Sequence, residues 1–529
     1  MKINFKSITL MAITAATIFS SCQKGDLLSN PNVAAESSTI PASLILNHIT
    51  ANMMREEEPI ISQVYKQNQF IVSNYPYYFG SNSYNFGTSN TMYDEIKYCV
   101  KLEEQAQKQY NSTTNNPYFA LSKFFKAYSL IWYSQRVGDI PATQAVNTNY
   151  VTPKYDTQHD VYKYALSLLD SANTLLAAQI TTTNANTKVD ASGDIFGLTY
   201  LQWQKVVNTY KLRTLISLSK RATDNADLNI PTQFATIINN PSQYPIMTST
   251  SDNLAYKYNS INYYPPNRAG YVPYNLCENI SSTFMNILTT NKDPRTFVLT
   301  TPASALVAST TVGDFSAYVG EDNNKSQSLM SNFTADGKHA SLSWNRYFSS
   351  STGANAEPYT IIGYAEMCFN IAEAANRGWI TTQSAATWYG KGVDASLSTY
   401  GITDGKVLTV GNGDGTKPNI GTVTADVATF KTKIAYAGDN ATGLTQILTQ
   451  KYVSFFMNSG FEAYYNWRRT GVPTFSQNGA GIGTADNMIP FRWQYPNDEK
   501  TSNTTNVNAA IASQYGGTDD LTAKMWLIK

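Results

Sequence analysis

Apolar side chains recur every three or four residues over long stretches of this chain, a spacing typical of amphipathic helices. Leu121, Phe124, Phe125 and Tyr128 illustrate it, with small alanines between the large rings. Such alanines allow close packing of antiparallel helix pairs, as in tetratricopeptide repeats, although the strict period of about 34 residues is absent. We therefore expect a mainly α fold, a scaffold of degenerate tetratricopeptide-like helix pairs. The predicted helices cover residues 120–137, 161–176, 200–218, 361–375, 385–397 and 444–456.

Long polar stretches rich in Asn, Ser, Thr and Gly separate these helices. They are longer than ordinary connections of about 4–6 residues, and loops of that length usually carry function or are disordered. The fold should therefore include an irregular, loop-rich region beside the helical scaffold. The stretches cover residues 71–92, 238–275, 300–343 and 401–424.

The beginning of the chain has the pattern of an export signal. Lys2 and Lys6 precede an apolar run over residues 8–19, which is too short to span a bilayer. Cys22 follows directly and resembles the lipobox cysteine of bacterial lipoproteins, whose thiol is acylated, although Phe19 stands where that motif has Leu, Val or Ile. The alternative is an ordinary secretory signal with an incidental cysteine. We predict a signal peptide over 1–21, a lipidated tether over 22–40 that carries fatty acyl chains such as palmitate, and one domain over 41–529.

Composition narrows the classes of ligand. Charged residues are only 15% of the chain, against about 25% in a typical protein. Without Lys2 and Lys6 the balance is 37 basic against 38 acidic residues, a net charge of −1. This argues against nucleic acid, which binds to a clustered basic face. The 36 tyrosines and many neutral polar residues suit uncharged polar ligands.

Residues that would carry catalysis or bind metal are not grouped in the sequence. The histidines His48, His159 and His339 have no second His or Cys at metal-ligand spacing. Nucleotide-binding and hydrolase motifs are absent, and residues 411–415 lack the alternating acids of a calcium loop. Acids are plentiful enough for a glycosidase, but nothing selects a pair. We therefore predict a non-enzymatic protein without cofactor, metal site or disulfide framework.

Several motifs, in order along the chain, resemble those of the SusD/RagB family of nutrient-binding outer-membrane lipoproteins of Bacteroidetes. The most specific is Gly460–Tyr464 followed by Trp467–Gly471 and Pro473. Tyr210 departs from the family pattern, which has Leu there. The other matching segments are Asp26–Asn32, Arg136–Pro141, Trp203 with Lys205, Asn208 and Arg213, Asp293–Arg295, Tyr364–Glu366 with Ala372–Ala374, and Tyr495–Glu499 with Asn503 and Trp526.

This resemblance implies a lipid-anchored, surface-exposed protein of the cell outer membrane. It further implies a lid over a SusC-like TonB-dependent transporter barrel, with an oligosaccharide as the usual ligand. A peptide-binding importer subunit and a surface adhesin are the alternatives. Glu366 and Glu373 lie on one helix face, where we expect bonds to backbone or arginine rather than catalysis. Arg468 and Arg469 suit an ion pair or helix cap better than a carboxylate clamp.

Two tyrosine-rich segments have the composition of a carbohydrate site, in which rings stack on sugars and neighbouring polar groups bond to hydroxyls. The alternative is that these rings pack the loops against the helices or a partner. Trp493 is a third candidate, for which core packing is the preferred interpretation. The candidate ligand-binding residues are Tyr77, Tyr78 and Tyr84 in the first segment, and Tyr263, Tyr264, Arg268 and Tyr271 in the second.

Overall fold

The computed structural model describes residues 38–56, 62–114, 116–261, 277–349, 356–413 and 415–529, except 478, 480, 483 and 485–487. Residues 42–529 pack together as one unit. The predicted signal peptide, Cys22 and most of the tether lie outside the described residues. Within the described part of the chain, no helix has both the length and the hydrophobicity to cross a bilayer.

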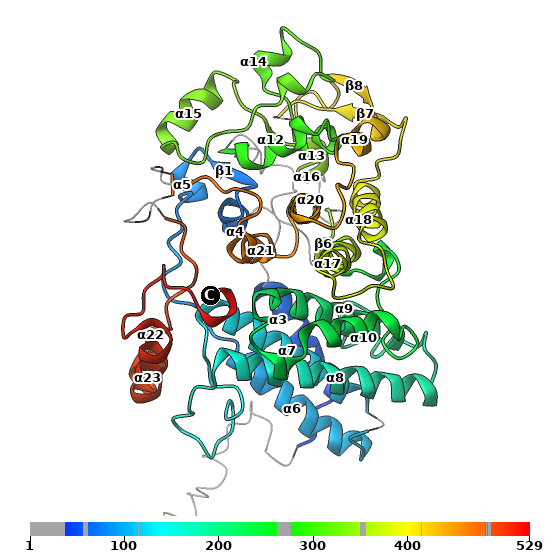
Figure 1. The fold of residues 1–529 in the computed structure, drawn as a ribbon, viewed down its shortest axis with the longest axis vertical. Helices are drawn as coiled ribbons and strands as arrows, with labels where there is room; N and C mark the ends of the chain where they lie inside the picture. The colour runs from blue at the N-terminus through cyan, green and yellow to red at the C-terminus, as the bar shows by residue number, and fades with distance from the viewer. Residues whose placement is uncertain are drawn as a thin grey trace, which may run out of the picture. The chain divides into compact units, whose positions relative to one another are not determined.

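A layer of long helices forms the lower part of Figure 1. Helices that follow one another along the chain pack against each other: α6 on α7, α7 on α8, and α8 on α9. This arrangement confirms the expected scaffold of helix pairs. The layer contains α3 (Ala42–Glu56), α6 (Tyr93–Tyr110), α7 (Pro117–Val137), α8 (Gln158–Thr182), α9 (Tyr200–Ser217) and α10 (Ile230–Asn239).

Local sequence explains where these helices begin and end. Helix α7 starts with Pro117 at its first position, and the Asn116 side chain accepts a hydrogen bond from the second backbone N–H. It stops at Gly138, whose φ of 97° is open to glycine but costly for other residues. Helix α9 begins with a capping box formed by Thr199 and Gln202. Both helices agree with the predicted ranges to within a few residues.

Helix α17 (Tyr364–Asn376) joins the long-helix layer to the rest of the fold. It packs on α9 and also on α18 (Ala385–Thr399) and α20 (Ala441–Ser454). The sequence prediction began this helix at residue 361, which is wrong. Ile361 and Ile362 belong to β6 (Tyr359–Ile362), which pairs with β2 (Leu254–Tyr256). A short apolar run fits a buried strand as well as a helix, so its periodicity could not locate the boundary.

The upper part of Figure 1 contains a small antiparallel sheet in the order β1-β3-β5-β4. Much of it is built from the stretches predicted as polar loops, which therefore carry short elements of structure. The strands are β1 (Ile71–Ser73), β3 (Glu278–Ile280), β4 (Thr300–Thr301) and β5 (Ser341–Leu342), and β7 (Val407–Val410) forms a separate hairpin with β8 (Gly421–Thr424).

Short helices surround this sheet and complete the chain. Helix α21 lies between the two parts, and residues Trp526–Ile528 near the C-terminus pack on α8. The helices around the sheet are α4 (Gln63–Gln67), α5 (Pro76–Phe79), α12 (Ser282–Thr290), α13 (Thr296–Leu299), α14 (Ser304–Val307), α15 (Gln327–Ala335), α16 (Trp344–Tyr347) and α19 (Val427–Lys433). The later ones are α21 (Glu462–Thr470), α22 (Asn497–Ser502) and α23 (Thr504–Tyr515).

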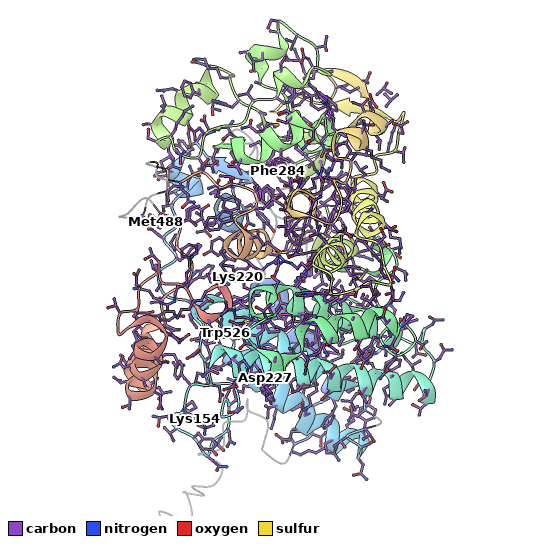
Figure 2. The ribbon with its side chains drawn as sticks, in the orientation of Figure 1. Lys154, Lys220, Asp227, Phe284, Met488 and Trp526 are labelled. Atoms are coloured by element: carbon purple, nitrogen blue, oxygen red, sulfur yellow. The ribbon has the colours of Figure 1, made fainter. Side chains whose placement is uncertain are left out.

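A cluster of aromatic rings forms the core beneath the sheet. Phe284, labelled in Figure 2, stacks on Phe456 with centroids 4.4 Å apart. Phe70, the residue before β1, forms T-shaped contacts with both rings. Burying side chains of this size contributes about 1.5–3 kcal/mol each, which holds β1 against α12 and the segment that follows α20.

Candidate functional site

Strands β1 and β3 bring together one end of each tyrosine-rich segment. Asn74 follows β1 directly, and Cys277 directly precedes β3. Because the strands are antiparallel, the end of β1 lies beside the beginning of β3. The backbone N–H of Asn74 donates to the carbonyl oxygen of Cys277 at 2.9 Å and extends the ladder. Residues far apart in the sequence therefore meet at one edge of the sheet.

Tyr75 and Tyr77 lie at this edge and face solvent. The side chain of Tyr77 is 78% exposed and that of Tyr75 is 40% exposed. Their ring centroids are 6.5 Å apart, with the planes inclined at 60°. Pro76 starts α5 between them, and Gln327 of α15 donates to the carbonyl of Gly80, which ends α5, at 2.9 Å. The ring of Tyr77 thus stands on a short helix that is held at both ends.

A polar cavity of about 160 Å³ opens beside Asn74. The Asn74 amide donates to Asn279 Oδ1 at 2.8 Å and to Thr334 Oγ1 at 3.1 Å, and both residues line the cavity. Hydroxyl and amide groups predominate in its wall, and among the described residues that line it none is Asp, Glu, Lys or Arg. The other lining residues are Thr301, Pro302, Ser304, Gly337, His339, Ser341, Asn412 and Gly413.

Among the described residues of this lining, His339 is the one titratable side chain. Its Nδ1 lies 3.0 Å from Oε2 of Glu321, a carboxylate with no exposed surface. Burial alone would raise the pKa of Glu321, but the neighbouring His339, the backbone N–H of Asp322 and Lys325 hold that pKa below its usual value. The carboxylate therefore lies beside the imidazole ring at the cavity wall.

The structure corrects one of the proposed ligand contacts. Tyr84 is only 1% exposed, and its hydroxyl donates to the carbonyl oxygen of Gln67 at 2.7 Å. Its ring therefore packs in the core, because residues from distant segments cover it. Trp493 is buried, which agrees with the core packing that the sequence analysis preferred for it. Its ring stacks on Phe86 with centroids 3.9 Å apart. Neither ring presents a face to solvent.

Other predicted contacts lie beyond what the structure describes. Tyr78 belongs to α5, but its side chain is outside the described part. The four candidates of the second segment also lie outside the described residues and stay predictions. They are Tyr263, Tyr264, Arg268 and Tyr271.

The acids and arginines of the sequence motifs are structural, as the sequence analysis favoured. Glu366 of α17 pairs with Arg213 of α9, whose Nε donates to Glu366 Oε1 at 2.7 Å. Glu373 lies on the same face of α17, seven residues further along, and its carboxylate accepts two hydrogen bonds from Arg469 of α21. Arg468 donates to two backbone carbonyl oxygens. These bonds tie α9, α17 and α21 together.

The described cysteines form no disulfide with one another. Cys99, Cys277 and Cys368 are free thiols, and burial raises the pKa of Cys368 to about 12, which suits a buried apolar role. Within the described ranges no group of three His, Cys, Asp or Glu side chains is placed to hold a metal ion.

Sequence reasoning missed the residues of the polar cavity. Asn279, Thr334 and Ser341 come from three separate elements, and Asn412 comes from the turn of the β7–β8 hairpin. Each is a common residue without a motif around it. The polar composition of residues 300–343 and 401–424 was the only signal, and it marked the stretches rather than the side chains.

The described residues form a helix-pair scaffold and a loop-rich region, which carries exposed tyrosines and a polar cavity. Residues 31–496 match the family model SusD-like_2, described as "Starch-binding associating with outer membrane". The chain belongs to this SusD-like family. Proteins of the family bind nutrients, are associated with the outer membrane and work with outer-membrane transporters.

Solved structures support the same assignment. A SusD homolog from Bacteroides fragilis is 26% identical, covers 92% of this chain and 100% of its own, and has a TM-score of 0.77. A second SusD homolog from that species is 27% identical, with coverages of 92% and 99% and a TM-score of 0.72. An outer-membrane protein from Bacteroides vulgatus described as involved in nutrient binding is 25% identical, with coverages of 93% and 100% and a TM-score of 0.72. Among curated proteins, no match was found.

Proposed function

We propose that this chain is a non-enzymatic glycan-binding lipoprotein on the outer surface of a bacterial outer membrane. Acyl chains on Cys22 anchor it, and it acts as the lid and binding partner of a SusC-like TonB-dependent transporter. Several acyl chains hold a protein on a membrane durably, since each buried methylene contributes about 0.8 kcal/mol. Membership of the SusD-like family supports the outer-membrane location.

The observation that carries the glycan assignment is that exposed rings and a polar cavity lie on either side of Asn74, and that the described lining of this cavity has no Asp, Glu, Lys or Arg. Tyr75 and Tyr77 offer amphipathic surfaces, and the cavity beside Asn74 offers hydroxyl and amide groups. A sugar has apolar C–H faces and a rim of hydroxyls, so it needs both kinds of surface together. Tyr78, Tyr263, Tyr264, Arg268 and Tyr271 remain part of the proposed site, and Tyr84 does not.

Migration in native gels that contain a neutral polysaccharide tests this proposal. We expect starch, chitin-derived or other neutral glycans to retard the purified protein. Tyr77→Ala should weaken the affinity for the glycan about five- to thirtyfold, because a ring contact contributes about 1–2 kcal/mol. Tyr150→Ala is the matched control, because Tyr150 is 46% exposed on a different loop. Both variants should keep the melting temperature of the wild type.

Two results would contradict the proposal. Equal retardation of the wild type and Tyr77→Ala would remove this edge from the ligand site. Retention of oligopeptides with indifference to every glycan would make the chain a peptide-binding importer subunit instead. Co-purification with the full-length lipoprotein tests the partnership separately. A β-barrel transporter should co-purify with an importer subunit, whereas no transporter should co-purify with an adhesin.

A further inference from the structure

A second cavity, of about 410 Å³, lies where α21 meets the segments around Lys220 and Phe491. It shares no lining residue with the polar cavity beside Asn74. Figure 2 labels Lys220 between the long-helix layer and the upper part of the fold. Its lining combines aromatic rings with Lys and Arg, which the described lining of the first cavity lacks.

The aromatic part of this second cavity is a rigid stack. The indole of Trp467 packs between Phe475, with centroids 4.9 Å apart, and Phe491, with centroids 6.2 Å apart. The three planes are nearly parallel, with angles of 4° and 10° to Trp467. Trp467 and Phe475 are largely buried, so Phe491 is the most exposed ring of the stack. Thr470 and Thr474 also line the cavity.

The charged lining is entirely basic. Lys220, Arg468 and Arg469 line the cavity, and no Asp or Glu is among its described lining residues. Arg469 is neutralised by Glu373, but Arg468 is not paired in this way. Its Nη1 and Nη2 donate to the carbonyl oxygens of Phe491 and Gln135, at 2.8 and 2.6 Å. The guanidinium also lies over the ring of Tyr465, 4.4 Å from its centroid, and its charge acts on the carboxylate of Glu462. Lys220 is therefore the cation of this lining that is best placed for a ligand.

Lys220 adds a reachable cation at the rim. It lies in the short 3₁₀ helix η1 (Ser219–Arg221), and its Nζ donates to the carbonyl oxygen of Ile528 at 3.0 Å. An ammonium has three donors, so this bond uses one of them. Partial burial lowers the pKa of Lys220, and the positive charges of Lys524, Arg221 and Arg469 lower it further. The neighbourhood therefore carries an excess of positive charge, which an anion would relieve.

We propose that this cavity is a second ligand site, which binds the carboxylate of an acidic sugar, a uronic acid. The carboxylate lies toward Lys220, and the sugar ring lies against the aromatic part of the lining, where Phe491 is the most exposed ring. The choice of a sugar as the source of the carboxylate rests on the proposed glycan-binding function. The volume accommodates one or two sugar rings, and the charge selects acidic glycans over neutral ones.

Isothermal titration calorimetry with digalacturonic acid and the neutral disaccharide galactobiose tests this site. We expect digalacturonic acid to bind at least about tenfold more tightly than galactobiose, because one hydrogen bond to a charged group changes the affinity by at least this factor. Lys220→Gln should weaken the binding of digalacturonic acid at least about tenfold. Lys154→Gln, an exposed lysine at a distant place in Figure 2, is the matched control and should change nothing.

A second variant separates this site from the tyrosine edge. Thr474 is exposed, so Thr474→Trp should fill the cavity, keep the fold and abolish binding of digalacturonic acid. Tyr77→Ala should leave that binding unchanged while it reduces retention by neutral glycans. Equal affinity for the two disaccharides, or unchanged binding in Lys220→Gln and Thr474→Trp, would overturn the proposal. Binding of an oligopeptide that the same variants abolish would overturn the assignment to a sugar.

Discussion

Replacing Glu373 with glutamine should destabilise the fold by about 3–5 kcal/mol at pH 7. The carboxylate has no exposed surface, and its Oε1 lies 2.5 Å from Arg469 Nη1 and 2.8 Å from Arg377 Nη2. Burial alone would raise its pKa, but the charges and hydrogen bonds of Arg469, followed by Arg377 and Lys451, lower it to about 2. Removing one partner of a buried pair costs about 3–5 kcal/mol, because the remaining charge stays buried.

The pKa gives an independent estimate of similar size. A drop from 4.5 to about 2 corresponds to about 3 kcal/mol of preference for the charged form in the folded state. Because the folded pKa is the lower one, this stabilisation is present above pH 4.5 and is lost as the pH falls toward 2. The difference in stability between wild type and Glu373→Gln should therefore shrink in that window.

Urea denaturation, followed by tryptophan fluorescence and circular dichroism, measures the difference at pH 7. Glu104→Gln is the matched control, because Glu104 also bonds to two cations, Lys101 at 2.9 Å and Lys108 at 3.0 Å. Glu104 lies at the surface of α6, where such pairs contribute less than about 1 kcal/mol. If the two variants lose the same free energy of unfolding, the reasoning from burial is refuted.

Three further outcomes follow from particular side chains. Tyr84→Phe should lose about 1 kcal/mol in urea denaturation, since it removes the hydrogen bond to Gln67, and unchanged stability would contradict its buried position. Burial raises the pKa of Asp139 from 3.8 to about 7, so the protonated form contributes stability below pH 3.8 that is lost as the pH rises through 7. The melting temperature of Asp139→Asn should accordingly fall less between pH 5 and pH 8 than that of the wild type, and parallel curves would argue against this pKa. Cys22→Ser should abolish incorporation of labelled palmitate and release the protein from the membrane fraction, and continued labelling would place the acyl chains elsewhere.

The helical scaffold could be predicted because its signals are local. Apolar spacing located α7, α9 and α18 to within a few residues, and Gly138 marks the end of α7 in sequence and structure alike. The structural role of Glu373 was also predicted, since an acid within a helix-packing motif has to meet a partner. The start of α17 was wrong because β6 owes its strand character to pairing with β2, which lies far away in the sequence.

Local sequence determined the helices and the supply of tyrosine and neutral polar side chains, because helix periodicity and composition need no information from distant residues. Tertiary structure alone decided which tyrosines meet solvent. Tyr77 and Tyr84 come from the same segment and had equal claims from sequence, yet one is 78% exposed and the other 1%. Tyr84 is covered because the backbone at Ile482 pairs with it and Gln67 accepts its hydroxyl, and such contacts exist only after the chain has folded. Both cavities arise in the same way, from side chains that become neighbours only when separate segments pack together.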